Sequence, residues 1–235
     1  MRVWNWDGFL GYFTNAYLLE GALVTLFLTV STLTLGFVLG LGVTLMRMSS
    51  SRALSGFSQF YVWVFRGTPL LVQLIIIYTG LPQLGLVRLS VFESAIIGLA
   101  LNEAAYLSEI LRGGILSVGA GQRDAARALG LNRRQAFLLV TMPQALRVII
   151  PPLGNSVNGL LKTTSIASVI SMEELLRRGQ ILMQQRFEVL EIFCVVAILY
   201  LVMTTAWDMV QRRIEAYFGK AYGAVEAKQL VRDDR

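Results

Sequence analysis

Residues 21–46 form a long apolar run that contains no charged side chain. An α-helix of this length is long enough to cross the hydrocarbon core of a bilayer with some tilt. Arg47 and Arg52 follow at once, and Lys and Arg collect on the cytoplasmic side of membrane helices. The run therefore predicts a transmembrane helix whose C-terminal end faces the cytoplasm.

The composition extends this prediction to the whole chain of 235 residues, which is 55% hydrophobic and only 15% charged. Soluble domains carry about a quarter charged residues. We expect an all-α integral membrane protein of about five spans, the later four near residues 55–81, 89–116, 145–164 and 188–209. The N-terminus is predicted outside and the C-terminus in the cytoplasm.

One membrane domain, residues 21–213, is expected between two short terminal segments. Residues 1–20 are rich in aromatic rings, which favour the membrane–water interface, and predict an interfacial segment. Residues 214–235 are predicted to form a cytoplasmic tail, polar and disordered from about residue 219.

Several functions are disfavoured by residues that the chain lacks. Histidine is absent, which removes the commonest general base and metal ligand. There is no phosphate-binding loop of the G-x-x-x-x-G-K-[ST] type. We therefore expect no catalytic site, metal or cofactor, and no ATP hydrolysis by that loop. The net charge of +6 lies mostly at the ends of apolar runs, which disfavours a nucleic-acid partner.

Polar residues punctuate the third predicted span. Asn102 and Glu103 lie near its middle and Tyr106 lies one turn further on. Ionisable groups within spans usually face a bundle interior or a wet cavity, so these three are candidates for a solute pathway. Glu109 and Arg112 are three residues apart and are expected to pair with each other.

The fourth predicted span carries a second polar face. Asn155, Asn158 and Lys162 follow i, i+3, i+7 spacing, and Pro151-Pro152 is expected to kink the helix before them. This face suits a pathway wall, and it equally suits hydrogen bonding between helices. Both interpretations remain open from the sequence.

Residues 122–143 contrast with the apolar spans on either side because they are basic. The pattern predicts two short helices, the first over residues 124–129. Gly130 is expected to end the first helix in a left-handed conformation, and Asn132 to cap the second. Pro143 marks where the second helix should kink or stop. Such a loop could dock into a groove of another protein or lie on anionic lipid.

This loop resembles the EAA motif of permease subunits in bacterial ABC importers. That motif has Glu-Ala-Ala, three residues, Gly, nine residues, Ile, any residue and Leu-Pro. Here it is Asp124-Ala125-Ala126, then Gly130, then Val140-Thr141-Met142-Pro143. In the family this loop is the coupling helix that docks on the ATPase. The resemblance implies that role for Asp124, Ala125, Ala126, Leu129, Gly130 and Pro143.

Other stretches are similar to the polar amino acid branch of these permeases, the histidine/glutamine/arginine type. They are residues 66–73, 102–106, 121–122 and 162–165. The resemblance implies a type I importer in the bacterial inner membrane with two permease subunits, two ATPase subunits that bind ATP, and an extracytoplasmic solute-binding protein. It leaves open which amino acid is carried and whether the second permease is a copy of this chain.

Two other classes remain as alternatives. A self-sufficient channel or secondary transporter would use Glu103 and Lys162 as an ion relay. A membrane enzyme would need Glu103 and Glu109 as an acid pair, but residues six apart lie on different faces of a helix.

Overall fold

The computed structural model describes residues 4–233, with side chains through residue 219, and all regular elements in that part are helical. This confirms the predicted all-α class. The elements are α1 (Trp6–Tyr12), α2 (Ala16–Arg47), α3 (Arg52–Gly67), α4 (Leu70–Ile75), η1 (Ile76–Gly80), α5 (Leu81–Gln83), α6 (Val91–Ser117), α7 (Ala120–Ala128), α8 (Arg133–Gln135), η2 (Ala136–Thr141), α9 (Met142–Thr163), η3 (Thr164–Ile170), α10 (Leu175–Arg186) and α11 (Val189–Asp233).

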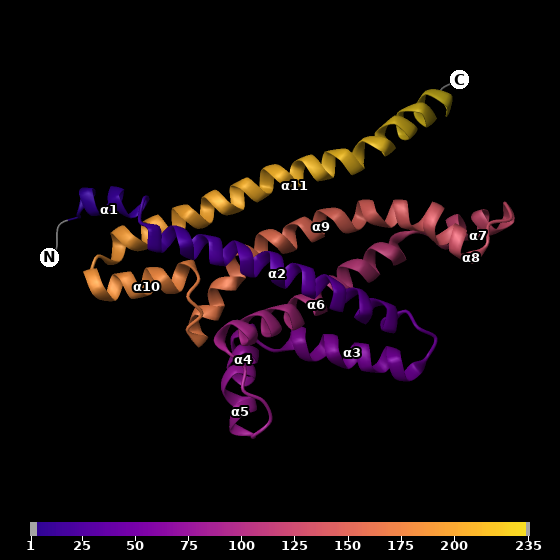
Figure 1. Cartoon of the computed structure of the whole chain (residues 1–235). Coiled ribbons are helices and arrows are strands. Elements are labelled where there is room, and N and C mark those ends of the chain that lie inside the picture. The colour runs from indigo at the N-terminus through magenta and orange to yellow at the C-terminus, as the bar shows by residue number, and fades with distance from the viewer. Residues whose placement is uncertain (1–3, 234–235) are drawn as a thin grey trace.

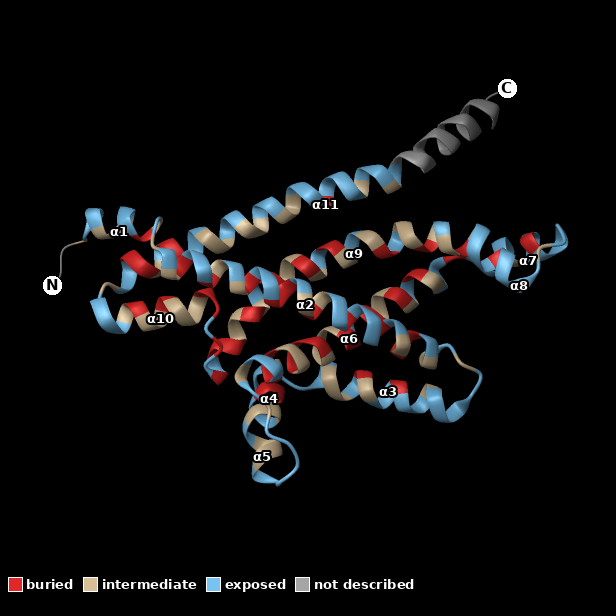
Figure 2. Ribbon diagram, viewed as in Figure 1, coloured by how far each residue is buried: buried red, intermediate tan, exposed pale blue. Residues whose placement is uncertain are grey.

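Four helical stretches of the described chain are long and apolar enough to cross a membrane: Ala16–Arg47, Val91–Ser117, Arg133–Ile170 and Val189–Gly219. A fifth crossing is reached if Arg52–Gly67 and Leu70–Gln83, which meet at 104°, are counted as one broken span. The long helices run the length of the bundle, with α1 and α10 at one end and α7 and α8 at the other (Figure 1). Much of the outward surface of α2 and α11 is exposed (Figure 2), including Leu23 and Leu201, as expected for helices that face lipid.

Helices α2 and α6 pack closely because glycine replaces larger residues on α2. A Cβ at Gly36 would lie 3.2 Å from Cβ of Glu103, and a Cβ at Gly40 would lie 3.0 Å from the carbonyl oxygen of Ala104. Small residues four apart let membrane helices approach backbone to backbone, where dispersion contacts replace the weak hydrophobic drive available in lipid. This contact fixes the position of α6, and with it that of Glu103.

We therefore expect Gly40→Leu to destabilise the bundle by about 1–3 kcal/mol, since the neighbouring backbone of α6 cannot move aside easily. Thermal unfolding of the detergent-solubilised protein, followed by circular dichroism, measures the change. Gly42→Leu is the matched control because a Cβ there meets nothing within 4 Å. Equal melting temperatures for the two variants would contradict this packing role.

A polar seam joins α9 to α11 around the two prolines of α9. Trp207 Nε1 donates to the carbonyl oxygen of Gly154 at 2.8 Å, and Gln211 Nε2 donates to Asn155 Oδ1 at 3.1 Å. Asn158 Nδ2 donates to Asp208 Oδ1 at 2.5 Å. Side chains of a neighbouring helix thus satisfy polar groups beside the prolines, which is the condition for proline inside a membrane helix.

Helix α10 is tied to the beginning of α2 at the opposite end from α7. Arg178 forms an ion pair with Glu20 at 2.8 Å and lies 4.6 Å from the centre of the Tyr17 ring. Glu174 caps α10 and is fully buried, which raises the pKa of its carboxyl. It accepts hydrogen bonds from Tyr200 Oη and from two backbone amides.

Three local predictions need correction. Helix α2 begins at Ala16 rather than at residue 21, because Asn15 accepts hydrogen bonds from the amides of Tyr17 and Leu18. The chain stays helical through Pro143, since the π-helical segment η2 directly before it adjusts the backbone where proline has no N–H. The tail predicted to be disordered continues α11 as far as Asp233, and extending an existing helix needs no new nucleus.

Candidate functional site

A break in the chain between α3 and α4 begins the site. Thr68 and Pro69 have extended backbones, so the helix stops at Gly67 and resumes at Leu70. Gln73 Nε2 donates to the carbonyl oxygens of Phe65 at 2.9 Å and Thr68 at 3.1 Å. Two buried or half-buried amides support the break, because Asn102 Nδ2 also donates to Phe65 O and to Gln73 Oε1, both at 3.0 Å.

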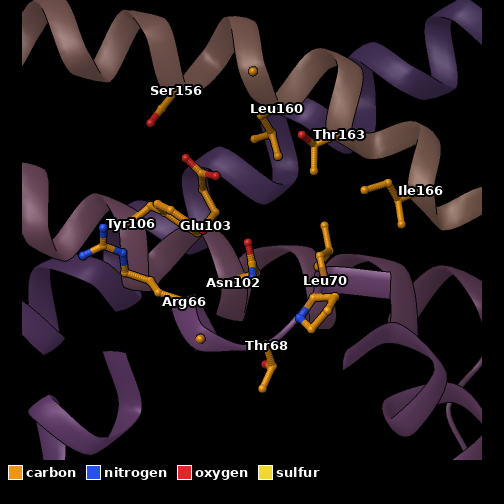
Figure 3. Close-up of a pocket in the computed structure, with 13 residues that line it drawn as sticks. Arg66, Thr68, Leu70, Asn102, Glu103, Tyr106, Ser156, Leu160, Thr163 and Ile166 are labelled. Atoms are coloured by element: carbon orange, nitrogen blue, oxygen red, sulfur yellow. The ribbon is translucent and has the colours of Figure 1, made fainter. Parts of the chain in front are cut away.

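The break opens onto a cavity of about 590 Å³ between three parts of the bundle. Figure 3 shows Glu103 and Tyr106 of α6 facing Ser156 and Leu160 of α9 across it. The lining residues are Arg66, Gly67, Thr68, Pro69, Leu70, Asn102, Glu103, Tyr106, Ser156, Gly159, Leu160, Thr163 and Ile166. A cavity of this size accommodates a small organic solute.

Two opposite charges face this cavity. The guanidinium of Arg66 lies 5.2 Å from the centre of the Tyr106 ring, a cation–π distance. The Glu103 carboxylate points toward Ser156 (Figure 3), and its Oε1 is buried with no hydrogen-bond partner in the described chain. A buried carboxylate oxygen without a donor is an unmet binding capacity, so the cavity can receive an ammonium or another hydrogen-bond donor.

The structure brings together only part of the predicted pathway set. Asn102, Glu103 and Tyr106 line the cavity, although the amide hydrogens of Asn102 are used by the helix break. Asn155 and Asn158 instead bond to α11, as the interhelical interpretation expected, and Lys162 lines a second cavity. Glu109 pairs with Arg112 at 2.7 Å, as predicted.

Sequence reasoning missed the α9 residues that do line the cavity. They are Ser156, Gly159 and Thr163, which share i, i+3, i+7 spacing one position along from the asparagine face. The signal was present in these small and polar residues, but the asparagines and the lysine drew attention to the neighbouring face. Thr68 and Pro69 were noted only as a bend.

The EAA-like loop forms a compact turn at the far end of the bundle. Gly130 has a φ of +82°, as predicted. Its amide donates to Arg127 O at 2.9 Å while the Leu131 amide donates to Ala126 O at 3.1 Å, which is a Schellman motif. Asn132 caps α8 by accepting from the Gln135 amide at 2.9 Å, also as predicted.

Exposure separates the residues of this loop. Leu129 is 83% exposed, whereas Ala126 is 3% exposed and packed within the chain. Asp124, Ala125 and Pro143 are exposed, and the 3.9 Å ion pair of Asp124 with Arg127 lies in solvent, where such pairs contribute little. The surface offered to another protein is therefore centred on Leu129, and no three potential metal ligands gather anywhere in the described residues.

Membrane-spanning helices around a polar cavity, with an exposed helical turn at one end, define a transmembrane permease. The chain belongs to the family of binding-protein-dependent transport system inner membrane components, whose model matches residues 32–219. It is therefore an inner-membrane permease subunit of an ABC import system, as the EAA-like motif indicated.

Individual relatives agree with this family. The chain is 38% identical to the arginine transport system permease protein ArgU of Corynebacterium glutamicum over 244 residues, which cover 98% of this chain and 77% of that protein. It is 38% identical to the glutamine transport system permease protein GlnP of Escherichia coli K12 over 199 residues, covering 84% and 91%.

Solved structures share the fold. A structure described as an amino acid ABC transporter with histidines matches with a TM-score of 0.86 at 36% identity, covering 92% of this chain and 100% of that chain. The MetNI methionine ABC transporter in an inward-facing conformation matches with a TM-score of 0.71 at 20% identity, covering 86% and 96%.

Proposed function

We propose that this chain forms half of the translocation pathway of an ATP-driven importer for a polar amino acid. The observation that carries the proposal is the cavity in which Arg66 and Glu103 present opposite charges within the bundle. A zwitterionic solute has a carboxylate for the guanidinium and an ammonium for the unpartnered Glu103 oxygen. Relatives named for arginine, glutamine and octopine transport support this class of solute.

The energy for transport comes, in this proposal, from ATP bound to separate ATPase subunits that dock on the turn around Leu129. The exposed leucine and the short α7 and α8 helices support it as a docking site. ATP and solute must each bind one conformation of the assembly better than the other, because a ligand that binds both equally shifts nothing.

The remaining parts of the assembly follow from the same proposal. A second permease chain completes the pathway, and an extracytoplasmic binding protein delivers the solute. The end that carries α7 and α8 faces the cytoplasm and the end that carries α1 and α10 faces outward, consistent with Arg47 and Arg52 at the α7 end. Residues 1–20, 21–213 and 214–235 then form outer, transmembrane and cytoplasmic segments.

Affinity purification of the tagged chain from its native membrane in mild detergent tests the assembly. We expect an ATPase with a phosphate-binding loop to co-purify, and the number of permease species in the sample distinguishes a homodimer from a heterodimer. In liposomes, uptake of amino acid should require both ATP and the ATPase. A chain that purifies alone and conducts ions by itself would instead support the channel alternative.

A further inference from the structure

A second cavity, of about 540 Å³, lies on the opposite side of α9 from the Glu103 cavity. It is bounded by the end of α9, η3, α10 and α11. Its wall is largely apolar and includes Leu176, Phe193, Val196, Ala197 and Leu201. The two cavities share no lining residue, so this one is a separate site.

The opening of this cavity faces the surroundings of the bundle. Leu201 is 63% exposed and Ala197 is exposed, while Val196 at the back of the wall is buried. All three belong to the stretch of α11 that is apolar enough to cross a membrane. In a bilayer, a cavity that opens between such residues opens to lipid.

The polar groups of this cavity are satisfied, with one exception. Ser165 Oγ donates to the carbonyl oxygen of Lys162 at 2.6 Å, and Tyr200 Oη donates to Glu174 at 2.7 Å. Lys162 is exposed, and its ammonium has no ion pair or hydrogen bond within residues 4–219.

The acids nearest to Lys162 along the chain and seam are already engaged. Glu174 accepts from Tyr200 and from two backbone amides, and Asp208 accepts from Asn158 at 2.5 Å. A cation inside a spanning segment needs an anionic partner or access to the headgroups. Its partner must therefore come from outside this chain.

We propose that this cavity binds an anionic phospholipid, with an acyl chain against Phe193 and Leu201 and the phosphate on the ammonium of Lys162. The apolar wall and the lipid-facing opening select an acyl chain, and the unpaired cation selects a negative headgroup. The long apolar stem of lysine lets its ammonium reach toward the headgroup level while the stem covers apolar wall.

Native mass spectrometry of the intact transporter complex, taken from nanodiscs of phosphatidylglycerol and phosphatidylcholine, tests the proposal. We expect retained phosphatidylglycerol to exceed its share in the bilayer, and Lys162→Met to reduce this enrichment about fivefold. Lys162→Arg should keep it, because the cation remains. Arg88→Met is the matched control, since it removes an exposed cation that lies outside the cavity. Equal enrichment in Lys162→Met and the unmodified chain would overturn the proposal.

A photoreactive benzoylphenylalanine placed at Leu201 identifies what occupies the opening. Lipid adducts are expected, and Ala197→Trp should reduce them by filling the cavity. Adducts with a second permease chain and none with lipid would overturn the proposal and assign the face to an interface between permeases. A Lys162→Met variant with weaker amino acid binding and unchanged lipid enrichment would also overturn it, and would place Lys162 in the solute pathway.

Discussion

Leu129→Glu is expected to release the ATPase from the permease while leaving the permease folded. Leu129 is 83% exposed, so the chain loses little packing when it becomes polar. In the proposed complex the same side chain is buried against the ATPase, where a central apolar anchor is commonly worth 2 kcal/mol or more, about thirtyfold in affinity. Co-purified ATPase and ATP-dependent uptake in liposomes should both fall by about that factor.

Two further variants isolate this effect. Leu84→Glu makes the same change at a leucine that is 74% exposed on the segment after α5, and should leave the ATPase bound. Ala126→Glu should instead lower the melting temperature of the permease itself, because it places a charge at a position that is 3% exposed. Normal ATPase recovery with Leu129→Glu would show that the docking surface lies elsewhere.

Glu103→Gln should weaken binding of an amino acid to the assembled transporter by roughly 10- to 100-fold, because a hydrogen bond to a charged group contributes about 1.5–3 kcal/mol. Glutamine has nearly the shape of glutamate, so the packing of α6 against Gly36 should be kept. Binding of labelled amino acid to the transporter in nanodiscs measures the change, and melting temperature checks the fold.

Glu93→Gln is the matched control for this prediction. It changes the same side chain on the same helix, but Glu93 belongs to the capping box at Ser90 and lies outside the cavity. Glutamine also completes a capping box, so binding and stability should be retained. Unchanged affinity and solute preference in Glu103→Gln would make Glu103 a structural residue.

The long helices could be predicted from the sequence because lipid imposes a simple rule on length and charge. The position of the bend at Pro69 could be predicted for the same kind of local reason. Its size of 104° could not, because Gln73 and Asn102 hold the break from positions on two different helices. Contacts of this kind depend on tertiary packing, which local patterns do not encode.

The candidate site shows the same division. Helical spacing correctly placed Asn155, Asn158 and Lys162 near one another, but spacing alone does not say which neighbour that face meets. Residues of α11 more than 50 positions further along the chain decide this for Asn155 and Asn158. Glu103 was found because a carboxylate in mid-span is costly unless it has a use.

The uninterrupted helical path from α8 to η3 has a mechanical consequence. Arg133–Ile170 contains 38 residues, about 57 Å of helix at an α-helical rise, and it contains both the Asn132-capped start beside the exposed turn and the Ser156 and Thr163 wall of the cavity. A helix is stiff along its axis, so an axial displacement at one end arrives at the other. The π-helical segment before Pro143 is the place where such a helix can change its winding, so rotation about the axis has a softer section there than translation does.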